Sequence, residues 1–242
     1  MNLLLVDQPE VVDGEVVLRD RRAAHLRTVL KVEVGQRVRA GLAHGAIGHA
    51  EVLAVDATQV RVRLDVHDVA PPPMPIELVL AMPRPKVLSR TLEIAAAWNV
   101  ARIDLVNAWR VDKAYLASPR LAPDALADSV RLGAEQGATT HLPTVTLHPR
   151  FMGYLDARHP VGAPPARGLC AHARGGVAIE AAPGGARTPA VLAIGPEGGW
   201  IEREVETFAA RGFAIVSMGD AILRVEAAVA GALAQLALLA RL

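Results

Sequence analysis

The chain has 242 residues, of which 52% are hydrophobic and 3% aromatic, and its formal net charge is +1. This length allows one large domain or two smaller ones, and the balanced charge gives no overall electrostatic case for binding nucleic acid. The single cysteine, Cys170, excludes an intramolecular disulfide and a cysteine-based zinc cluster. The histidines lack ligand spacing, so we expect no metal.

The two ends of the chain give no indication of export or membrane insertion. The first ten residues include acidic side chains and lack the basic region and cleavage site of a signal peptide. The C-terminal Ala/Leu-rich segment begins with Arg224 and Glu226 and is interrupted by Gln235, so its longest apolar run is too short to span a bilayer. We therefore expect a cytoplasmic protein whose last helix is buried or forms a dimer interface.

Residues 1–70 have the pattern of a small β-rich domain. Short alternating segments separated by glycine or Asp-Ala-Thr turns predict strands over 15–18, 36–40, 49–55 and 59–65, with one helix over 20–30. Short strands at this spacing are typical of a barrel. Four prolines then fall within residues 71–75, which predicts a semi-rigid linker and a domain boundary.

From residue 76 to 242 the pattern changes to alternating strands and helices. Strands are predicted over 76–82, 101–106, 168–173, 190–194 and 214–218, and helices over 86–99, 123–137, 201–210 and the C-terminal segment. This alternation predicts an α/β domain with a mainly parallel sheet. In such sheets ligands bind in the crevice at the carboxyl ends of the strands.

Two of these strands run into glycines, and the first does so at Gly195-Pro196-Glu197-Gly198-Gly199. A tight turn is one interpretation of this loop, and a phosphate-binding loop is another. The spacing G-x-G-x-x-G and a following Lys-Ser/Thr are both absent, which argues against a nucleotide-dependent dehydrogenase. Glu197, Glu202 and Glu204 place negative charge where a phosphate would bind. The loop therefore favours a neutral or cationic ligand, such as an adenine edge or a sulfonium compound.

Arg224 follows Gly219 at the start of the last helix, where a positive charge is electrostatically unfavourable. Two explanations stay open on local grounds. The guanidinium forms an ion pair with Glu197 or Glu226, or it is directed at a substrate group such as an RNA phosphate or a uracil carbonyl.

A group of cations also lies in the N-terminal region, around the predicted helix. They are Arg19, Arg21, Arg22, Arg27, Lys31, Arg37 and Arg39, with His25 among them. Such a one-sided patch suits contacts with phosphates, and it is also compatible with an ordinary solvated helix face.

The segments GPEGGW (195–200) and SMGDAILRVEAA (217–228) together resemble the C-terminal signature of the RsmE family. Members of this family are SPOUT-class methyltransferases that methylate N3 of a uridine in 16S ribosomal RNA with S-adenosylmethionine. Residues 25–31, 83–86 and 110–113 are also similar to the family. The resemblance implies a C-terminal SPOUT α/β domain with a trefoil knot, an N-terminal PUA-like β-barrel and a homodimer that acts on 16S ribosomal RNA or the small ribosomal subunit.

The resemblance also assigns roles to individual residues. Arg224 is expected to be catalytic, because a cation near a uracil carbonyl favours the reactive N3 anion. The residues expected to bind the methyl donor are Leu192, Ile194, Gly195, Pro196, Glu197, Gly198, Gly199, Met218, Gly219, Ile222 and Leu223. Those expected to bind RNA are Arg21, Arg22, His25, Arg27, Lys31, Arg84 and Lys86.

The sequence departs from the family at two places near Arg224. Asp220-Ala221 replaces the usual Pro-Arg, and Val225-Glu226-Ala227 replaces Thr-Glu-Thr. These departures support an alternative, in which the protein is a catalytically inactive relative that binds RNA or the ribosome.

Overall fold

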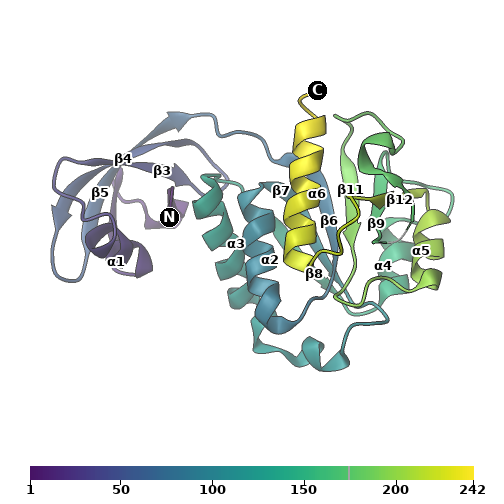
Figure 1. Ribbon diagram of the computed structural model, residues 1–242. Coiled ribbons are helices and arrows are strands. Elements are labelled where there is room, and N and C mark those ends of the chain that lie inside the picture. The colour runs from purple at the N-terminus through teal and green to yellow at the C-terminus, as the bar shows by residue number, and fades with distance from the viewer. Residues whose placement is uncertain (174) are drawn as a thin grey trace. The chain divides into compact units, whose positions relative to one another are not determined.

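The computed structural model describes residues 1–173 and 175–242. It divides into two compact units (Figure 1). Unit 1 contains Met1–Pro73 and Arg131–Leu142, and unit 2 contains Met74–Val130 and Pro143–Leu242. The first division falls at the proline-rich segment, where Met74 and Pro75 already begin a strand. Residues 131–142, which include the last turns of helix α3 (Pro123–Gly137), belong to unit 1.

Unit 1 is built on a five-stranded sheet. Its strands are β1 (Leu4–Val6), β2 (Glu15–Leu18), β3 (Arg37–Leu42), β4 (Ile47–Val55) and β5 (Val60–Asp68). Their order is β1-β3-β4-β5-β2, with β1 parallel to β3 and the other pairs antiparallel. Helix α1 (Arg21–Thr28) packs Ala23 and Leu26 into the core beneath the sheet. The ladders of these described strands leave β1 and β2 at the edges, so a closed barrel is not confirmed.

Unit 2 is an α/β unit with a seven-stranded sheet, as the alternating pattern predicted. The strands are β6 (Met74–Ala81), β7 (Val100–Val106), β8 (Thr144–His148), β9 (Gly168–Ala171), β10 (Val177–Ala178), β11 (Ala190–Ile194) and β12 (Phe213–Ser217). They pair in parallel in the order β10-β12-β9-β11-β6-β7-β8. The sequence pattern missed β1, β8 and β10, which are short.

Helices cover both faces of this sheet (Figure 1). They are α2 (Pro85–Ala97), α4 (Phe151–Arg158), α5 (Glu202–Ala209) and α6 (Val225–Leu239). Short 3-10 turns of unit 2 lie at Lys113–Ala117, Pro119–Leu121 and Ile179–Ala181, and another, at Gln8–Glu10, belongs to unit 1. Alternate residues of β6 face opposite ways. Leu78 and Leu80 pack with α2 and α6, whereas Val79 and Ala81 pack with α4 and α5.

The apolar helix α6 is explained by this packing. One side of it is buried against α2 and the sheet through Val229, Leu233 and Leu236. Among the helices that the structure describes, none is long and apolar enough to cross a membrane.

A buried polar network crosses the α4 side of the sheet. Asp104 of β7 is completely buried, and its Oδ1 lies 2.7 Å from Arg102 Nη2 and 2.8 Å from His148 Nε2. The Tyr154 hydroxyl lies 3.4 Å from Asp104 Oδ2 and 3.2 Å from His159 Nε2. Burial raises the pKa of Tyr154 and lowers the pKa of His159. Burial therefore disfavours the protonated form of His159 in the folded unit.

We expect stability to fall on acidification because of this histidine. Burial holds the pKa of folded His159 below its ordinary value of 6.5, so the unfolded chain takes up a proton first. Its contribution is complete above pH 7 and is lost as the pH falls below about 6.5. Urea denaturation between pH 5.5 and 8 measures this slope, which His159→Gln should flatten. Burial also lowers the pKa of His25, but His25 is present in both proteins, so the difference between their slopes is due to residue 159. Equal slopes would contradict the assignment.

Candidate functional site

A cavity of about 440 Å³ lies at the carboxyl edge of the sheet of unit 2. Four loops contribute to it, after β7, β9, β11 and β12, and the first turn of α6 closes one side. Its lining residues are Arg110, Ala171, His172, Ala173, Ile194, Gly195, Pro196, Glu197, Gly198, Gly199, Trp200, Met218, Gly219, Ala221, Ile222, Leu223, Val225 and Ala228. The two glycine-containing segments singled out from the sequence thus meet around one cavity.

Glycine is favoured at three positions of the loop 195–199 by close packing or by backbone conformation. A Cβ atom on Gly195 would lie 3.1 Å from the Trp200 backbone nitrogen, and one on Gly198 would lie 3.0 Å from Arg110 Cδ. Gly199 has a φ of +70°, a backbone conformation that other residues rarely adopt. Gly195, Gly198 and Gly199 therefore present backbone rather than side chains to the cavity.

The acidic side chains around the loop have defined structural partners. Glu197 Oε1 accepts a hydrogen bond of 2.9 Å from the backbone nitrogen of Arg84, the residue that precedes α2. Glu204 is buried, and its two oxygens accept from the backbone nitrogens of Ile201 (2.9 Å) and Trp109 (2.8 Å). These carboxylates hold the loops after β6, β7 and β11 together, and their charge disfavours a phosphate ligand there.

Two residues that the sequence analysis did not assign to the site support these loops. The guanidinium of Arg110, which lines the cavity, donates a hydrogen bond to the carbonyl of Gly198. Gln235 Nε2 on α6 donates to the carbonyl of Met218 at 2.9 Å. A lone amide in an otherwise apolar helix was the available signal for Gln235, although the sequence interpretation used it only to exclude a membrane span.

Most of the predicted donor-binding residues line the cavity. They are Ile194, Gly195, Pro196, Glu197, Gly198, Gly199, Met218, Gly219, Ile222 and Leu223. Leu192 differs, because it is completely buried in the core between the sheet and the helices α2 and α6.

Arg224 is the N-cap residue of α6 and is exposed, between the cavity-lining residues Leu223 and Val225. Across residues 1–173 and 175–242, its guanidinium has no hydrogen bond or ion pair. The ion pairs considered with Glu197 and Glu226 are therefore not formed in this structure. A cation with no partner in the described chain stands at the edge of the cavity.

The predicted RNA-binding cations of unit 1 differ in their availability. Arg22 is buried, and its guanidinium donates to the Leu5 carbonyl at 2.9 Å and to both carboxylates of Glu10 and Asp20. Arg21 forms a two-point ion pair with Glu135, at 2.7 and 2.8 Å. Both arginines therefore serve the packing of unit 1.

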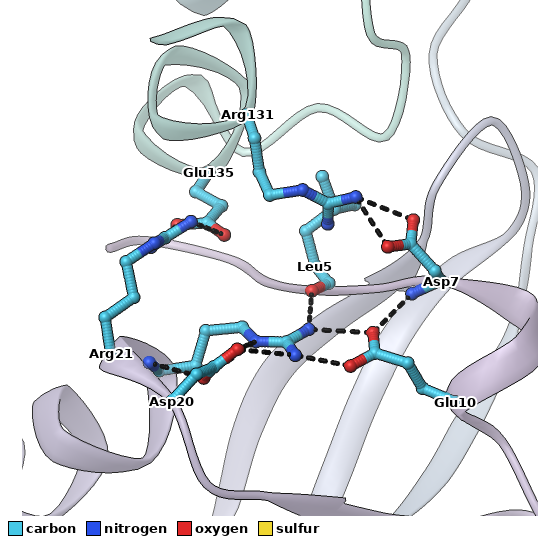
Figure 2. Close-up of polar contacts among 8 residues, drawn as sticks. Leu5, Asp7, Glu10, Asp20, Arg21, Arg131 and Glu135 are labelled. Carbon is cyan, nitrogen blue, oxygen red and sulfur yellow. Dashed lines mark hydrogen bonds and ion pairs between the residues drawn. The ribbon is translucent and has the colours of Figure 1, made fainter. Parts of the chain in front are cut away.

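The pKa shifts in this cluster agree with a structural role for Arg22. Burial alone lowers the pKa of its guanidinium, but the hydrogen bonds to Glu10 and Asp20 outweigh this effect and raise it. The same hydrogen bond from Arg22 lowers the pKa of Glu10. The cluster continues through Asp7, whose carboxylate accepts two hydrogen bonds of 2.7 Å from Arg131 (Figure 2).

The remaining predicted RNA-binding residues are more accessible. Lys31 is exposed, Arg27 and His25 are half-buried, and Arg27 donates to the Asp56 carbonyl at 3.3 Å. Arg84 and Lys86 are exposed in unit 2, at the start of α2. The histidines and acids of the described residues form no group suited to a metal ion.

Comparison with known proteins assigns the family. The model of an RNA methyltransferase domain matches residues 70–237. The ribosomal RNA small subunit methyltransferase E of Treponema pallidum is 32% identical over 240 residues, covering 97% of this chain and 90% of the relative. The chain belongs to the family of ribosomal RNA small subunit methyltransferase E. A second family member, from Synechocystis, is 24% identical over 236 residues, covering 96% and 76% of the two chains.

Solved structures share the fold of the entire chain. The family member from Neisseria gonorrhoeae, bound to S-adenosylmethionine, matches with a TM-score of 0.73 at 22% identity, covering 99% of this chain and 98% of that one. A Legionella pneumophila protein in complex with the same cofactor matches with a TM-score of 0.75 at 23% identity, covering 98% and 97%. The α/β fold of unit 2 is therefore the fold of this family.

Replacing Gln235 tests whether α6 holds the loop after β12. Gln235→Leu removes the donor to the Met218 carbonyl, and Gln235→Glu removes it while keeping the shape. We expect both to weaken binding of S-adenosylmethionine roughly tenfold, because the loop must then be ordered on binding. Calorimetry gives the affinity, and Glu206→Gln on the exposed side of α5 is the control. If both Gln235 variants bound S-adenosylmethionine as tightly as the wild type, Gln235 would have no role in ordering the loop after β12.

Comparing the free energies of unfolding of Arg22→Met and Arg37→Met distinguishes a structural arginine of unit 1 from a surface arginine. Arg22→Met leaves Glu10, Asp20 and the Leu5 carbonyl without their shared donor and should cost about 2 to 4 kcal/mol. Arg37→Met breaks an ion pair with Asp65 whose side chains are both more than half exposed, and should cost less than about 1 kcal/mol. Urea unfolding measures both, and equal losses would contradict the distinction.

Proposed function

We propose that this protein methylates N3 of a uridine in 16S ribosomal RNA with S-adenosylmethionine as the methyl donor. The observation that carries the proposal is the convergence of GPEGG and Met218–Leu223 on one cavity, beside an exposed arginine without a partner in the described chain, in a member of this family.

The cavity fits this cofactor by its chemistry. Backbone groups of Gly195 to Gly199 offer both donors and acceptors to an adenine edge, and Ile194, Met218 and Leu223 supply apolar surface. Glu197 places negative charge at the cavity wall, which is compatible with a sulfonium cation and unfavourable for a phosphate. When bound, the cofactor supplies an electrophilic methyl group.

Arg224 then acts on the nucleobase. Uracil N3 carries a proton at neutral pH, so the attacking species is the anion that forms when this proton leaves to solvent. As the N–C bond formed, the bond between the methyl carbon and the sulfonium sulfur would break, and the donor would leave as a neutral thioether. A cation close to a uracil carbonyl stabilises the negative charge that spreads from N3 onto oxygen. The guanidinium of Arg224, which has no partner among residues 1–173 and 175–242 and lies at the positive end of α6, is suited to this role.

The proposal assigns different tasks to the parts of the chain. Residues 1–70 form a PUA-like domain that holds the RNA backbone through Arg27, Lys31 and His25. Residues 71–75 act as the linker, and residues 76–242 carry out catalysis. Arg84 and Lys86 extend the RNA contact to the catalytic part. Arg21 and Arg22 are left out of this contact set because of their ion pairs.

A trefoil knot, a homodimer and a cytoplasmic location complete the proposal. Strand β12 pairs with β9, two strands away from β6, whereas α6 packs against α2. Residues 218–224 must therefore cross back over the edge of β9 and β11, which supports a knot. Exposed apolar side chains at Leu238 and Leu242 on the last helix and its end support pairing with a second copy.

The substitution Arg224→Ala tests the catalytic role. We expect an intact fold, an S-adenosylmethionine affinity within about twofold of the wild type, and a methylation rate on small-subunit RNA reduced roughly 100-fold. Arg203→Ala removes another exposed arginine of unit 2 and serves as the control. Calorimetry and transfer of labelled methyl groups provide the two readouts, with mass mapping of the RNA to locate the product.

Two results would change the proposal. A normal rate in Arg224→Ala would make this residue structural. Wild-type protein that binds S-adenosylmethionine and RNA but labels none would favour the inactive relative, for which the departures at Asp220 and Val225 are the supporting observation.

A further inference from the structure

Trp109 is an exposed aromatic residue in the loop that follows β7. Its exposed fraction is 79%, although its neighbours Ala108 and Val111 are buried at 5% and 6%. The loop is therefore anchored by these two residues, while the indole ring of Trp109 projects from it. Such exposure of a large aromatic side chain is typical of a contact surface.

Buried hydrogen bonds fix the backbone beneath this ring. The backbone nitrogen of Trp109 donates to the buried carboxylate of Glu204 at 2.8 Å. The next residue, Arg110, lines the cavity and binds the carbonyl of Gly198. Trp109 consequently stands beside the cavity, on a loop that is tied to the cavity wall.

The surface around Trp109 is cationic. The loops after β6 and β7 and the first turns of α2 carry the exposed side chains of Arg84, Lys86, Arg90, Arg110, Lys113 and Arg120. Hydrogen bonds hold these segments together. The backbone nitrogen of Arg84 donates to Glu197, which precedes Gly198, and Arg120 Nη1 donates to Ser89 Oγ of α2 at 3.0 Å. The exposed acids here are Glu197 and Asp112, and Asp112 already accepts a hydrogen bond from the backbone of Ala114.

An aromatic ring surrounded by cations matches single-stranded RNA. Unpaired bases stack on aromatic side chains while arginine and lysine neutralise the neighbouring phosphates. A second copy of this chain is a poorer occupant, because a twofold interface would place these cations against one another. Protein interfaces are also depleted in lysine at their centres.

We propose that Trp109 stacks on an unpaired nucleobase of the substrate RNA next to the nucleotide in the cavity. The inference rests on the proposed function and names a positioning residue for the same site. Trp109 holds the RNA strand so that the target base reaches the cavity, and it takes no part in binding the methyl donor.

The test compares three substitutions at this position. Trp109→Ala and Trp109→Leu should raise the KM for RNA roughly ten- to hundredfold, with kcat and the affinity for S-adenosylmethionine within about twofold of the wild type. Trp109→Phe keeps a ring that can stack and should recover most of the loss. Trp98→Ala is the matched control, since Trp98 is 37% exposed at the far end of α2.

Several outcomes would overturn the proposal. They are an unchanged KM in Trp109→Ala, full recovery by Trp109→Leu, a weakened cofactor affinity, or dissociation of an oligomer in light scattering, which would make Trp109 a contact between copies. Failure of the proposed function is distinguished by wild-type protein that neither binds S-adenosylmethionine nor labels RNA. In that case the RNA affinities of the same variants, measured by filter binding, still decide whether Trp109 contacts RNA.

Discussion

The arrangement of the cavity depends on the buried carboxylate of Glu204. One oxygen caps the first turn of α5, and the other holds the backbone of Trp109 after β7. Because β7 and β11 are separated in the sheet by β6, this single side chain joins loops that the sheet alone does not bring into contact. Burial of this carboxylate is tolerated because each oxygen accepts a hydrogen bond from a backbone nitrogen, which replaces a hydrogen bond to water.

Charge is distributed unevenly around this arrangement. Glu197 and Glu204 use their oxygens on backbone donors, and Arg110 uses its guanidinium on the Gly198 carbonyl. Arg224 has no such partner among the described residues. Electrostatic stabilisation of a reacting group requires a charge that is not already neutralised. The charges that build the cavity are therefore distinct from the charge of Arg224, which has no partner in the described chain.

The sequence predicted the α/β architecture and most of the cavity wall, because glycines after apolar strands leave a strong local pattern. It could not predict the partners of Arg22 or Arg21, since Glu10 and Glu135 reach them only through the tertiary fold. Nor could it identify Arg110 or Gln235, whose roles depend on backbone carbonyls that no residue pattern reports. The short strand β1 was missed because all three of its residues are buried and show no alternation, and β8 was missed because its partly exposed residues give no apolar pattern.

Unit 1 is built from two separate segments of the chain, and this has a consequence for the order in which the chain folds. Its first residues hydrogen-bond to the carbonyl of Glu135, and Leu3 and Leu5 pack with Ala134. During synthesis the N-terminal sheet emerges first but lacks these partners until residues 131–142 have left the ribosome. The earliest segment to be made therefore carries unprotected apolar surface while half of the remaining chain is translated, a period in which binding by a chaperone would be most effective.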